Sequence, residues 1–286
     1  MYLDKEKLDR IQEEIYSSGK WAVEKQGDLH ISLKEDKSVV TEVDITISHR
    51  ILALIKSLFP DAAIISEAEI TEEKDNPPYT FVLDPIDGTD VYSQGFPSFC
   101  IALGILDSNK EPVGAMIYAP RFGVGTDEGA FLRLDPEGEL LLNGRKFTMK
   151  GDKKTVQQLA VSSTCIWKFD FTKYRGKARS LGCSILHILL PVLFPSIAAS
   201  INEPSFIWDY AAAHAVIRSQ GMDLFAPDGS RYVYSSSFLN RERSETPVYG
   251  GEKETVEELI KLCPQRELQA PERGRIYSSL PLQRSL

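Results

Sequence analysis

The sequence predicts a mixed fold in which an α+β half is followed by an α/β half. Two amphipathic helical patterns open the chain, and a run of short strands follows them. After the polar segment 150–158, strands and helices alternate instead. With 286 residues, 42% of them apolar, the chain is long enough for one large domain or two modest ones. We therefore expect an N-terminal subdomain at residues 1–150, a C-terminal subdomain at 151–264 and a tail at 265–286.

The first half combines two helices with an antiparallel meander. Apolar residues recur at helical spacing over residues 3–25 and 45–58, and Phe59-Pro60-Asp61 stops the second helix. Short apolar runs bounded by turn residues predict the strands. These strands span 62–66, 79–83, 99–106 and 112–120, with a continuation through 129–135 and 139–149.

The second half predicts alternating strands and helices. Strands are expected at 159–163, 196–201 and 246–251. Helices are expected at 183–193, 208–221 and 253–263. Gly221 is a typical C-terminal stop for the helix before it. The final residues, 265–286, have no clear periodicity and are interpreted as an arm or a loosely held tail.

One segment of this half has the length of a membrane span. Residues 181–201 contain no Asp, Glu, Lys or Arg. Pro191 and Pro195 break the run, and His187 interrupts its apolar surface together with several serines. A buried helix, a proline-marked turn and a buried strand explain the segment better. We therefore expect no membrane association.

Charge and cysteine content narrow the class of protein further. The net charge of −8 and the pI near 5.2 argue against nucleic acid or an anionic membrane as the main partner. A small anionic substrate stays possible, because a bound metal can reverse the local field. The four cysteines lie far apart without a CxxC pair, which indicates reduced, mostly buried thiols in a cytoplasmic protein. The charged N-terminus does not resemble a secretory signal.

The stretch "VLDPIDGTD" at residues 82–90 delivers acidic groups to one tight corner. Asp84 and Asp87 lie three residues apart, and the turn between them can aim both carboxylates and the Ile86 carbonyl at one point. Oxygen ligands of this kind select hard cations, and a few carboxylates with water suit magnesium. An ordinary acidic turn after a strand is the alternative, since Asp, Pro and Gly are usual turn residues.

Gly88 and Thr89 give the same corner a second possible role. If a helix begins there, its free N–H groups form an anion site, and glycine lets the backbone approach an oxyanion closely. An anion pocket beside a cation that carboxylates hold is the arrangement typical of sites that catalyse phosphoryl transfer.

Three further acidic residues end strands or open helices, namely Asp44, Glu67 and Asp209. The alternative interpretation is that Asp44 and Asp209 are helix N-caps and that Glu67 is a solvated carboxylate in a loop. Because the corner at residues 84–89 already predicts a cation site, we consider all three as candidate additional ligands.

Five segments in order give the chain a family resemblance. They are "VVTEVD" (39–44), "FPDAAIISEAE" (59–69), "DPIDGT" (84–89), "RSLGCS" (179–184) and "WDYAAA" (208–213). Together they resemble the signatures of the inositol monophosphatase superfamily, and the likeness spans roughly residues 1–263. The resemblance implies the layered α-β-α-β-α sandwich of the inositol monophosphatase and fructose-1,6-bisphosphatase type.

The resemblance also implies roles for individual residues. The implied cofactor is Mg²⁺, as two or three ions, and the implied assembly is a homodimer. The implied metal ligands are Glu67, Asp84, the Ile86 carbonyl, Asp87 and Asp209. The implied substrate contacts are Gly88, Thr89, Gly182, Ser184 and Asp209. The implied catalytic residues are Glu67, Thr89 and Asp44, with Asp44 holding the Thr89 hydroxyl.

The expected activity is Mg²⁺-dependent hydrolysis of a small phosphomonoester by direct, in-line attack of water. Inositol monophosphate is the default substrate. Fructose 1,6-bisphosphate, histidinol phosphate and 3′-phosphoadenosine 5′-phosphate are alternatives that the metal motif does not separate. A catalytically silent scaffold that keeps the fold is a further alternative, motivated by the altered sequence around the motifs.

Three departures from the family pattern concern the surroundings of the metal site. Ala68 stands where the family has a second glutamate, and Glu69 follows it. Asp90 adds a negative charge beside the phosphate corner, which disfavours a highly anionic substrate. The segment 202–204 fills the place of an acidic inositol contact without a clear alignment.

A basic cluster precedes "LGCS" and is expected on a loop. It is read as a solvated surface, or as residues that reach a substrate phosphate or a dimer interface. The cluster comprises Lys168, Lys173, Arg175, Lys177 and Arg179.

Overall fold

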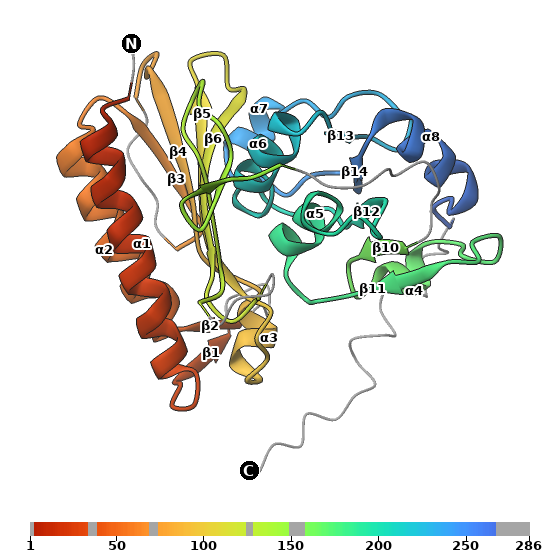
Figure 1. Ribbon diagram of the computed structural model, residues 1–286, viewed down its shortest axis with the longest axis horizontal. Coiled ribbons are helices and arrows are strands. Elements are labelled where there is room, and N and C mark those ends of the chain that lie inside the picture. Colours follow the sequence, from red (N-terminus) through yellow and green to blue (C-terminus); the bar gives the residue numbers. More distant parts are fainter. Residues whose placement is uncertain (1–2, 34–38, 69–73, 124–127, 149–157, 267–286) are drawn as a thin grey trace.

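The computed structural model describes residues 3–33, 39–68, 74–123, 128–148 and 158–266, arranged as helices packed on two large β-sheets, with a small two-stranded sheet in addition. The expected boundary segment near residue 150 and almost all of the tail 265–286 lie outside the described residues, as does Glu69. The structure is layered (Figure 1). An outer pair of helices covers the first sheet, a layer of helices separates the first sheet from the second, and a further pair of helices covers the outer side of the second sheet.

The larger sheet has seven strands in the order β3-β4-β5-β6-β7-β8-β9. The strands are β3 (Ala63–Ser66), β4 (Tyr79–Asp87), β5 (Cys100–Asp107), β6 (Pro112–Ala119), β7 (Ala130–Leu134), β8 (Leu141–Leu142) and β9 (Arg145–Lys146). Only the β3–β4 pairing is parallel, and the rest of the sheet is the expected antiparallel meander.

Both faces of this sheet are covered, which explains the unbroken apolar run of β4. Phe81 and Leu83 point into the core beneath α1 (Lys5–Lys25) and α2 (Glu42–Leu58), whereas Val82 points into the core on the other face. Strand side chains alternate between faces, so a strand buried on both sides shows no polar alternation. A short antiparallel pair, β1 (Ile31–Leu33) and β2 (Val39–Thr41), lies next to the five-residue helix α3 (Thr89–Ser93).

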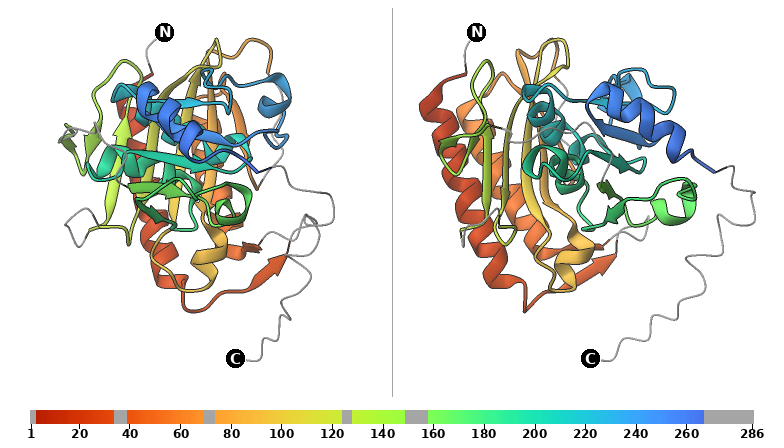
Figure 2. Two further views of the ribbon diagram at one scale, coloured as in Figure 1. Left: turned by 90° about the vertical axis from the view of Figure 1, so that its right-hand side faces the viewer. Right: turned by 45° about the vertical axis from the view of Figure 1, so that its right-hand side comes forward.

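The smaller sheet has five strands in the order β11-β10-β12-β14-β13. They are β10 (Gln158–Val161), β11 (Lys177–Arg179), β12 (Ala199–Asn202), β13 (Asp223–Phe225) and β14 (Val248–Gly251). The helices of this half are α4 (Cys165–Lys168), α5 (Ser184–Leu193), α6 (Ala211–Ser219), α7 (Ser236–Leu239) and α8 (Lys253–Leu262). Figures 1 and 2 show α5 and α6 between the two sheets, and α4 and α8 on the outer side of the smaller sheet. The α-β-α-β-α sandwich is therefore confirmed.

The helical layer between the sheets depends on small residues. A Cβ on Gly104 of β5 would lie 2.8 Å from both the Ala211 Cβ and the Ala212 nitrogen. Glycine and alanine at this crossing let α6 approach the sheet backbone closely. This approach fixes the start of α6, and with it the position of Asp209 in the 3₁₀ turn Ile207–Asp209.

Several elements differ from the expectation. The helix expected at 208–221 begins with this 3₁₀ turn, and β4 continues four residues past its expected end, up to Asp87. The basic segment expected as a loop contains β11, an exposed edge strand without apolar alternation. Residues 181–201 form α5, a turn at Pro195 and β12. In the described part of the chain, no helix combines the length and the apolarity that a membrane span requires.

Candidate active site

The end of β4 forms the acidic corner that the sequence predicts. The pairing of β4 with β5 is regular up to Asp84 and shifts before Asp87, so the strand is irregular where the carboxylates leave it. Asp84 and Asp87 are 2% and 4% exposed. The Asp84 Oδ1 accepts the Ile86 N–H at 3.0 Å, which fixes the turn between the two aspartates.

Asp209 joins this corner from the other half of the chain. Carboxylate oxygens of Asp84, Asp87 and Asp209 lie within 4.8 Å of one another. Asp209 is held in place because its Oδ2 accepts the Ser205 hydroxyl at 2.5 Å and the Phe206 N–H at 3.0 Å. Two carboxylates from the end of β4 and one from the 3₁₀ turn Ile207–Asp209 therefore converge on one point, which an ordinary acidic turn would not produce.

The electrostatics of this group favour a bound cation. Burial raises the pKa of Asp87 to about 6, although hydrogen bonds to its carboxylate oppose the shift. Loss of hydration and the nearby Asp87 raise the pKa of Asp209 to about 7. Burial and the charges of Glu67, Asp87 and Asp209 raise the pKa of Asp84 well above its ordinary value. A donor set of clustered carboxylates fits a hard divalent cation, which would relieve the repulsion.

Glu67 lies within electrostatic range of the whole group, at the end of β3. Its N–H donates to the Leu83 carbonyl at 3.3 Å, which ties the residue to β4. Its charge contributes to the raised pKa values of all four site aspartates, Asp44, Asp84, Asp87 and Asp209. Glu67 is not one of the three residues whose carboxylate oxygens lie within 4.8 Å of one another, and its role as a metal ligand stays a prediction.

The amino terminus of α5 is docked on Asp87. The Ile185 and Ser184 N–H groups donate to the Asp87 carboxylate at 2.6 and 3.2 Å, and the Cys183 thiol donates at 2.7 Å. Gly182 has a φ of 75°, and a Cβ there would lie 2.3 Å from the Val91 Cγ1. The segment "LGCS" is therefore next to the acidic corner, as the resemblance implied.

Asp44 is linked to Thr89. The Thr89 Oγ1 lies 3.0 Å from the Asp44 Oδ1 and 2.7 Å from the Ile86 carbonyl oxygen. The other Asp44 oxygen accepts the Thr41 N–H at 2.9 Å and the Thr41 hydroxyl at 2.6 Å. Thr41 is thus the N-cap of α2, and Asp44, the third residue of the helix, completes the capping box rather than being the cap itself. Burial raises the pKa of Asp44 to about 6.

Gly88 is required by its surroundings. Its φ is 83°, and a Cβ would lie 3.1 Å from the Ser98 carbonyl oxygen and 3.2 Å from the Gly182 carbonyl oxygen. It caps α3, so a helix does begin at Thr89 as considered from the sequence. The binding of a phosphate by the Gly88 and Thr89 amides stays a prediction.

A polar cavity of about 210 Å³ adjoins the acidic corner. Ser184 and Ser205, the neighbours of Asp87 and Asp209, line it together with Thr164, His187 and Glu203. The Thr164 Oγ1, the His187 Nδ1 and the Glu203 Oε1 are buried without a hydrogen-bond partner. Such buried polar atoms carry a desolvation cost unless a ligand or water satisfies them, so the cavity is suited to a hydroxylated molecule.

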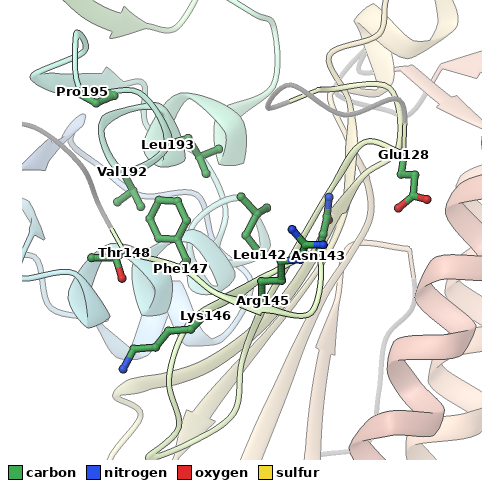
Figure 3. Close-up of a pocket in the computed structure, with 10 residues that line it drawn as sticks. All are labelled: Glu128, Leu142, Asn143, Arg145, Lys146, Phe147, Thr148, Val192, Leu193 and Pro195. Atoms are coloured by element: carbon green, nitrogen blue, oxygen red, sulfur yellow. The ribbon is translucent and has the colours of Figure 1, made fainter.

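A larger cavity of about 670 Å³ lies elsewhere (Figure 3). It runs between the β8–β9 hairpin and the end of α5, where Leu142, Phe147, Val192 and Leu193 line it. Its lining contains none of the acidic residues described above, so size alone does not identify the active site.

Sequence reasoning missed two neighbours of the site. Glu203, whose segment had no clear alignment, lies in the polar cavity and pairs with Lys168 of the basic cluster. Arg241 donates from its Nη2 to the Glu67 carbonyl at 3.4 Å and lies over the Trp208 ring at 5.7 Å. Neither residue belongs to a motif, and only the tertiary fold brings them here.

The comparisons with known proteins agree with this geometry. A sequence model described as the "Inositol monophosphatase family" matches residues 4–265. "Inositol monophosphatase 1" of Saccharomyces cerevisiae is 33% identical over 241 residues, which cover 74% of this chain and 80% of that protein. The chain belongs to the inositol monophosphatase family.

Two further comparisons concern a short sequence match and a solved structure. The "Fructose-1,6-bisphosphatase/inositol-1-monophosphatase" of Aquifex aeolicus is 36% identical over 93 residues, 32% of this chain. That match spans only 34% of the relative's own length. The solved structure of the Thermotoga maritima IMPase superposes with a TM-score of 0.73 at 20% identity, covering 90% of this chain and 96% of that one. This second likeness shows a shared fold.

Proposed function

We propose that this inositol monophosphatase family member hydrolyses a small phosphomonoester in a Mg²⁺-dependent reaction. The observation that carries the proposal is the convergence of Asp84, Asp87 and Asp209 within 4.8 Å. Membership of a family named for a phosphatase supports it independently.

The residues that would hold the cofactor are Glu67, Asp84, Asp87, Asp209 and the Ile86 carbonyl. Two or three Mg²⁺ ions bound there would supply positive charge to the phosphoryl oxygens, the attacking water and the leaving alcohol. This is the chemistry that a phosphate monoester needs, because its own negative charge repels a nucleophile and makes the uncatalysed hydrolysis extremely slow.

Thr89 and Glu67 would orient and deprotonate the attacking water. When the Thr89 hydroxyl donates to Asp44, the lone pairs of its oxygen remain free to accept a hydrogen bond from water. Asp44 keeps the hydroxyl in this orientation and, as the water proton moves to the Thr89 oxygen, would accept the Thr89 hydroxyl proton and become neutral. Water then attacks phosphorus in line, the ester P–O bond breaks and the alcohol leaves without a phosphoenzyme.

We propose inositol monophosphate as the default substrate among small phosphorylated metabolites. The polar cavity beside Asp87 and Asp209 offers hydroxyl, imidazole and carboxylate partners for a polyol. Asp90 adds a negative charge beside the Gly88–Thr89 corner, which disfavours substrates with a second phosphate such as fructose 1,6-bisphosphate or 3′-phosphoadenosine 5′-phosphate. Histidinol phosphate is the remaining alternative. We also propose a homodimer, by family analogy.

Phosphate release from a panel of inositol, sugar, nucleotide and histidinol phosphates tests the function. We expect activity that requires millimolar Mg²⁺ and is highest with inositol monophosphate. No release from any member, with the protein folded, would favour the silent scaffold instead. Transfer of phosphate to an added alcohol would contradict direct attack by water.

A further inference from the structure

A pair of cysteines lies directly behind Asp87. Cys100 begins β5 and is the cross-strand partner of Asp87. Cys183 is the residue before α5 and donates its thiol to Asp87. The two sulfurs are 3.8 Å apart, both side chains are fully buried and neither forms a disulfide. The sequence does not predict that these two cysteines are neighbours, because they are far apart in the chain.

These three residues bring together two sulfurs and a carboxylate oxygen, the donor set of a soft metal site. The two sulfurs and an Asp87 oxygen lie within 4.8 Å of one another. Two thiolates bound to one tetrahedral zinc ion at about 2.3 Å are about 3.8 Å apart, which is the separation observed between Cys100 and Cys183. Thiolate ligands select zinc and similar ions over magnesium, which prefers oxygen.

We propose that Asp87, Cys100 and Cys183 form a second cation site, specific for a thiophilic divalent ion such as Zn²⁺. Binding replaces the two thiol protons, which leave to solvent, with two metal–sulfur bonds and one metal–oxygen bond. The site shares Asp87 with the group of Asp84 and Asp209, so the soft ion and magnesium compete for one carboxylate.

The charges around the cysteine pair act on it in two ways. Burial, Asp87 and Asp209 raise the pKa of the Cys100 thiol, so both thiols stay protonated until an ion displaces their protons, and Asp84 lies close by as well. All three neighbours are carboxylates, so the local charge attracts a divalent ion. The consequence for activity rests on the function proposed above. An ion bound at the cysteine pair inhibits the phosphatase because Asp87 is then no longer available as a magnesium ligand.

Cobalt binding tests the site without reference to activity. Co²⁺ added to the full-length, reduced protein should produce a thiolate-to-cobalt charge-transfer absorption that saturates at one ion per chain and disappears when Zn²⁺ is added. Cys100→Ser and Cys183→Ser should each lose most of this absorption. Cys165→Ser, which alters another buried cysteine, should retain it. Folding of each variant is checked by circular dichroism, and Cys100→Ser keeps the test valid if Cys183→Ser does not fold.

Inhibition by zinc tests the shared ligand. At saturating Mg²⁺, the Zn²⁺ concentration that halves phosphate release should rise at least tenfold in Cys100→Ser and stay unchanged in Cys165→Ser. No thiolate–cobalt absorption in the folded wild type would overturn the site, whatever the activity. Equal zinc sensitivity of both variants would overturn the competition for Asp87. A wild type with the cobalt absorption but without phosphatase activity would contradict the proposed function alone.

Discussion

Asp87 accepts three hydrogen bonds from the α5 terminus and still contributes an oxygen to the carboxylate group. It therefore links the docking of α5 to the cation site. Two other residues, Glu203 and Arg241, show how much of the site lies outside the motifs. The positions of Asp84 and Asp87 follow from local spacing, whereas those of Glu203 and Arg241 depend on contacts between distant segments.

Asp87→Asn should reduce kcat/KM at least a hundredfold, because the amide keeps an acceptor oxygen for α5 but loses the charge that holds a cation. The stability of the metal-free variant should change little, because the repulsion with Asp84 and Asp209 is relieved while the amide nitrogen can no longer accept the α5 N–H group that it faces. Its thermal stabilisation by Mg²⁺ should be lost. Phosphate release and melting curves with and without Mg²⁺ measure these effects, and activity within threefold of the wild type would contradict the assigned role.

Thr89→Ala should lower kcat by about 10²- to 10⁴-fold, the usual contribution of a positioned proton-transfer group. Thr89→Ser should recover most of the activity, because it keeps the hydroxyl that Asp44 orients. Asp44→Asn combined with Thr89→Ala should be little worse than Thr89→Ala alone, as expected for residues that act as a unit. Strictly additive losses in this double-mutant cycle would show that the two residues act separately.

The pH dependence of stability has a defined sign. Because the folded protein raises the pKa of Asp44 and Asp87 to about 6 and of Asp209 to about 7, it binds protons more tightly than the unfolded chain. This stabilisation is complete below the unfolded pKa, near 4, and is lost as the pH rises through 6 and 7. Mg²⁺ binds the deprotonated carboxylates, so its stabilising effect should grow from pH 5 to pH 8. Melting temperatures with and without Mg²⁺ across this range provide the check, and a constant or decreasing difference would contradict it.

At the scale of elements, the site depends on where strands and helices end. The end of β4, the start of α3, the 3₁₀ turn before α6 and the start of α5 each supply part of it. Hydrophobic pattern predicted the long elements well, because both faces of β4 and the inner faces of α1 and α2 are buried. It missed β11, whose exposed basic residues resemble a loop, and it placed the end of β4 too early because Asp84 and Asp87 resemble a turn.

Gly88→Ala tests the junction between β4 and α3. An alanine at a φ of 83° is strained by about 1–2 kcal/mol, and its Cβ would also press on the Ser98 and Gly182 carbonyl oxygens. Gly95→Ala is a matched control, because Gly95 has a φ of 84° with nothing within 4 Å of the new Cβ. We expect both variants to lose stability, and only Gly88→Ala to lose most of its activity. Equal activity of the two in phosphate-release assays would show that the close approach at Gly88 is dispensable.

At the scale of the whole molecule, the cation site is assembled between the larger sheet and the helical layer packed on it. Asp84 and Asp87 belong to the larger sheet, whereas Asp209 is positioned by α6, which packs between both. This convergence follows from the resemblance but not from composition or periodicity, because no local pattern relates residues so far apart in the chain. The crossing of α6 over β5 at Gly104 is the contact that sets their relative position.

Gly104→Ala should therefore weaken both the fold and the cation site. Its Cβ would lie 2.8 Å from Ala211 and Ala212, an overlap that typically costs about 1–3 kcal/mol through forced backbone shifts. Gly27→Ala, where nothing lies within 4 Å, is the control for the substitution itself. Denaturant unfolding and Mg²⁺ titration of both variants measure the effect. Unchanged stability and Mg²⁺ affinity in Gly104→Ala would mean that α6 is not held by this contact.

The order in which the ribosome makes the chain gives the divided site a further consequence. Asp44, Glu67, Asp84 and Asp87 are synthesised long before Asp209, so a polypeptide released early carries most of the acidic groups but cannot complete the pocket. Prematurely terminated products would then be inert towards metabolites, because the acidic group is complete only when the 3₁₀ turn that carries Asp209 packs against the end of β4.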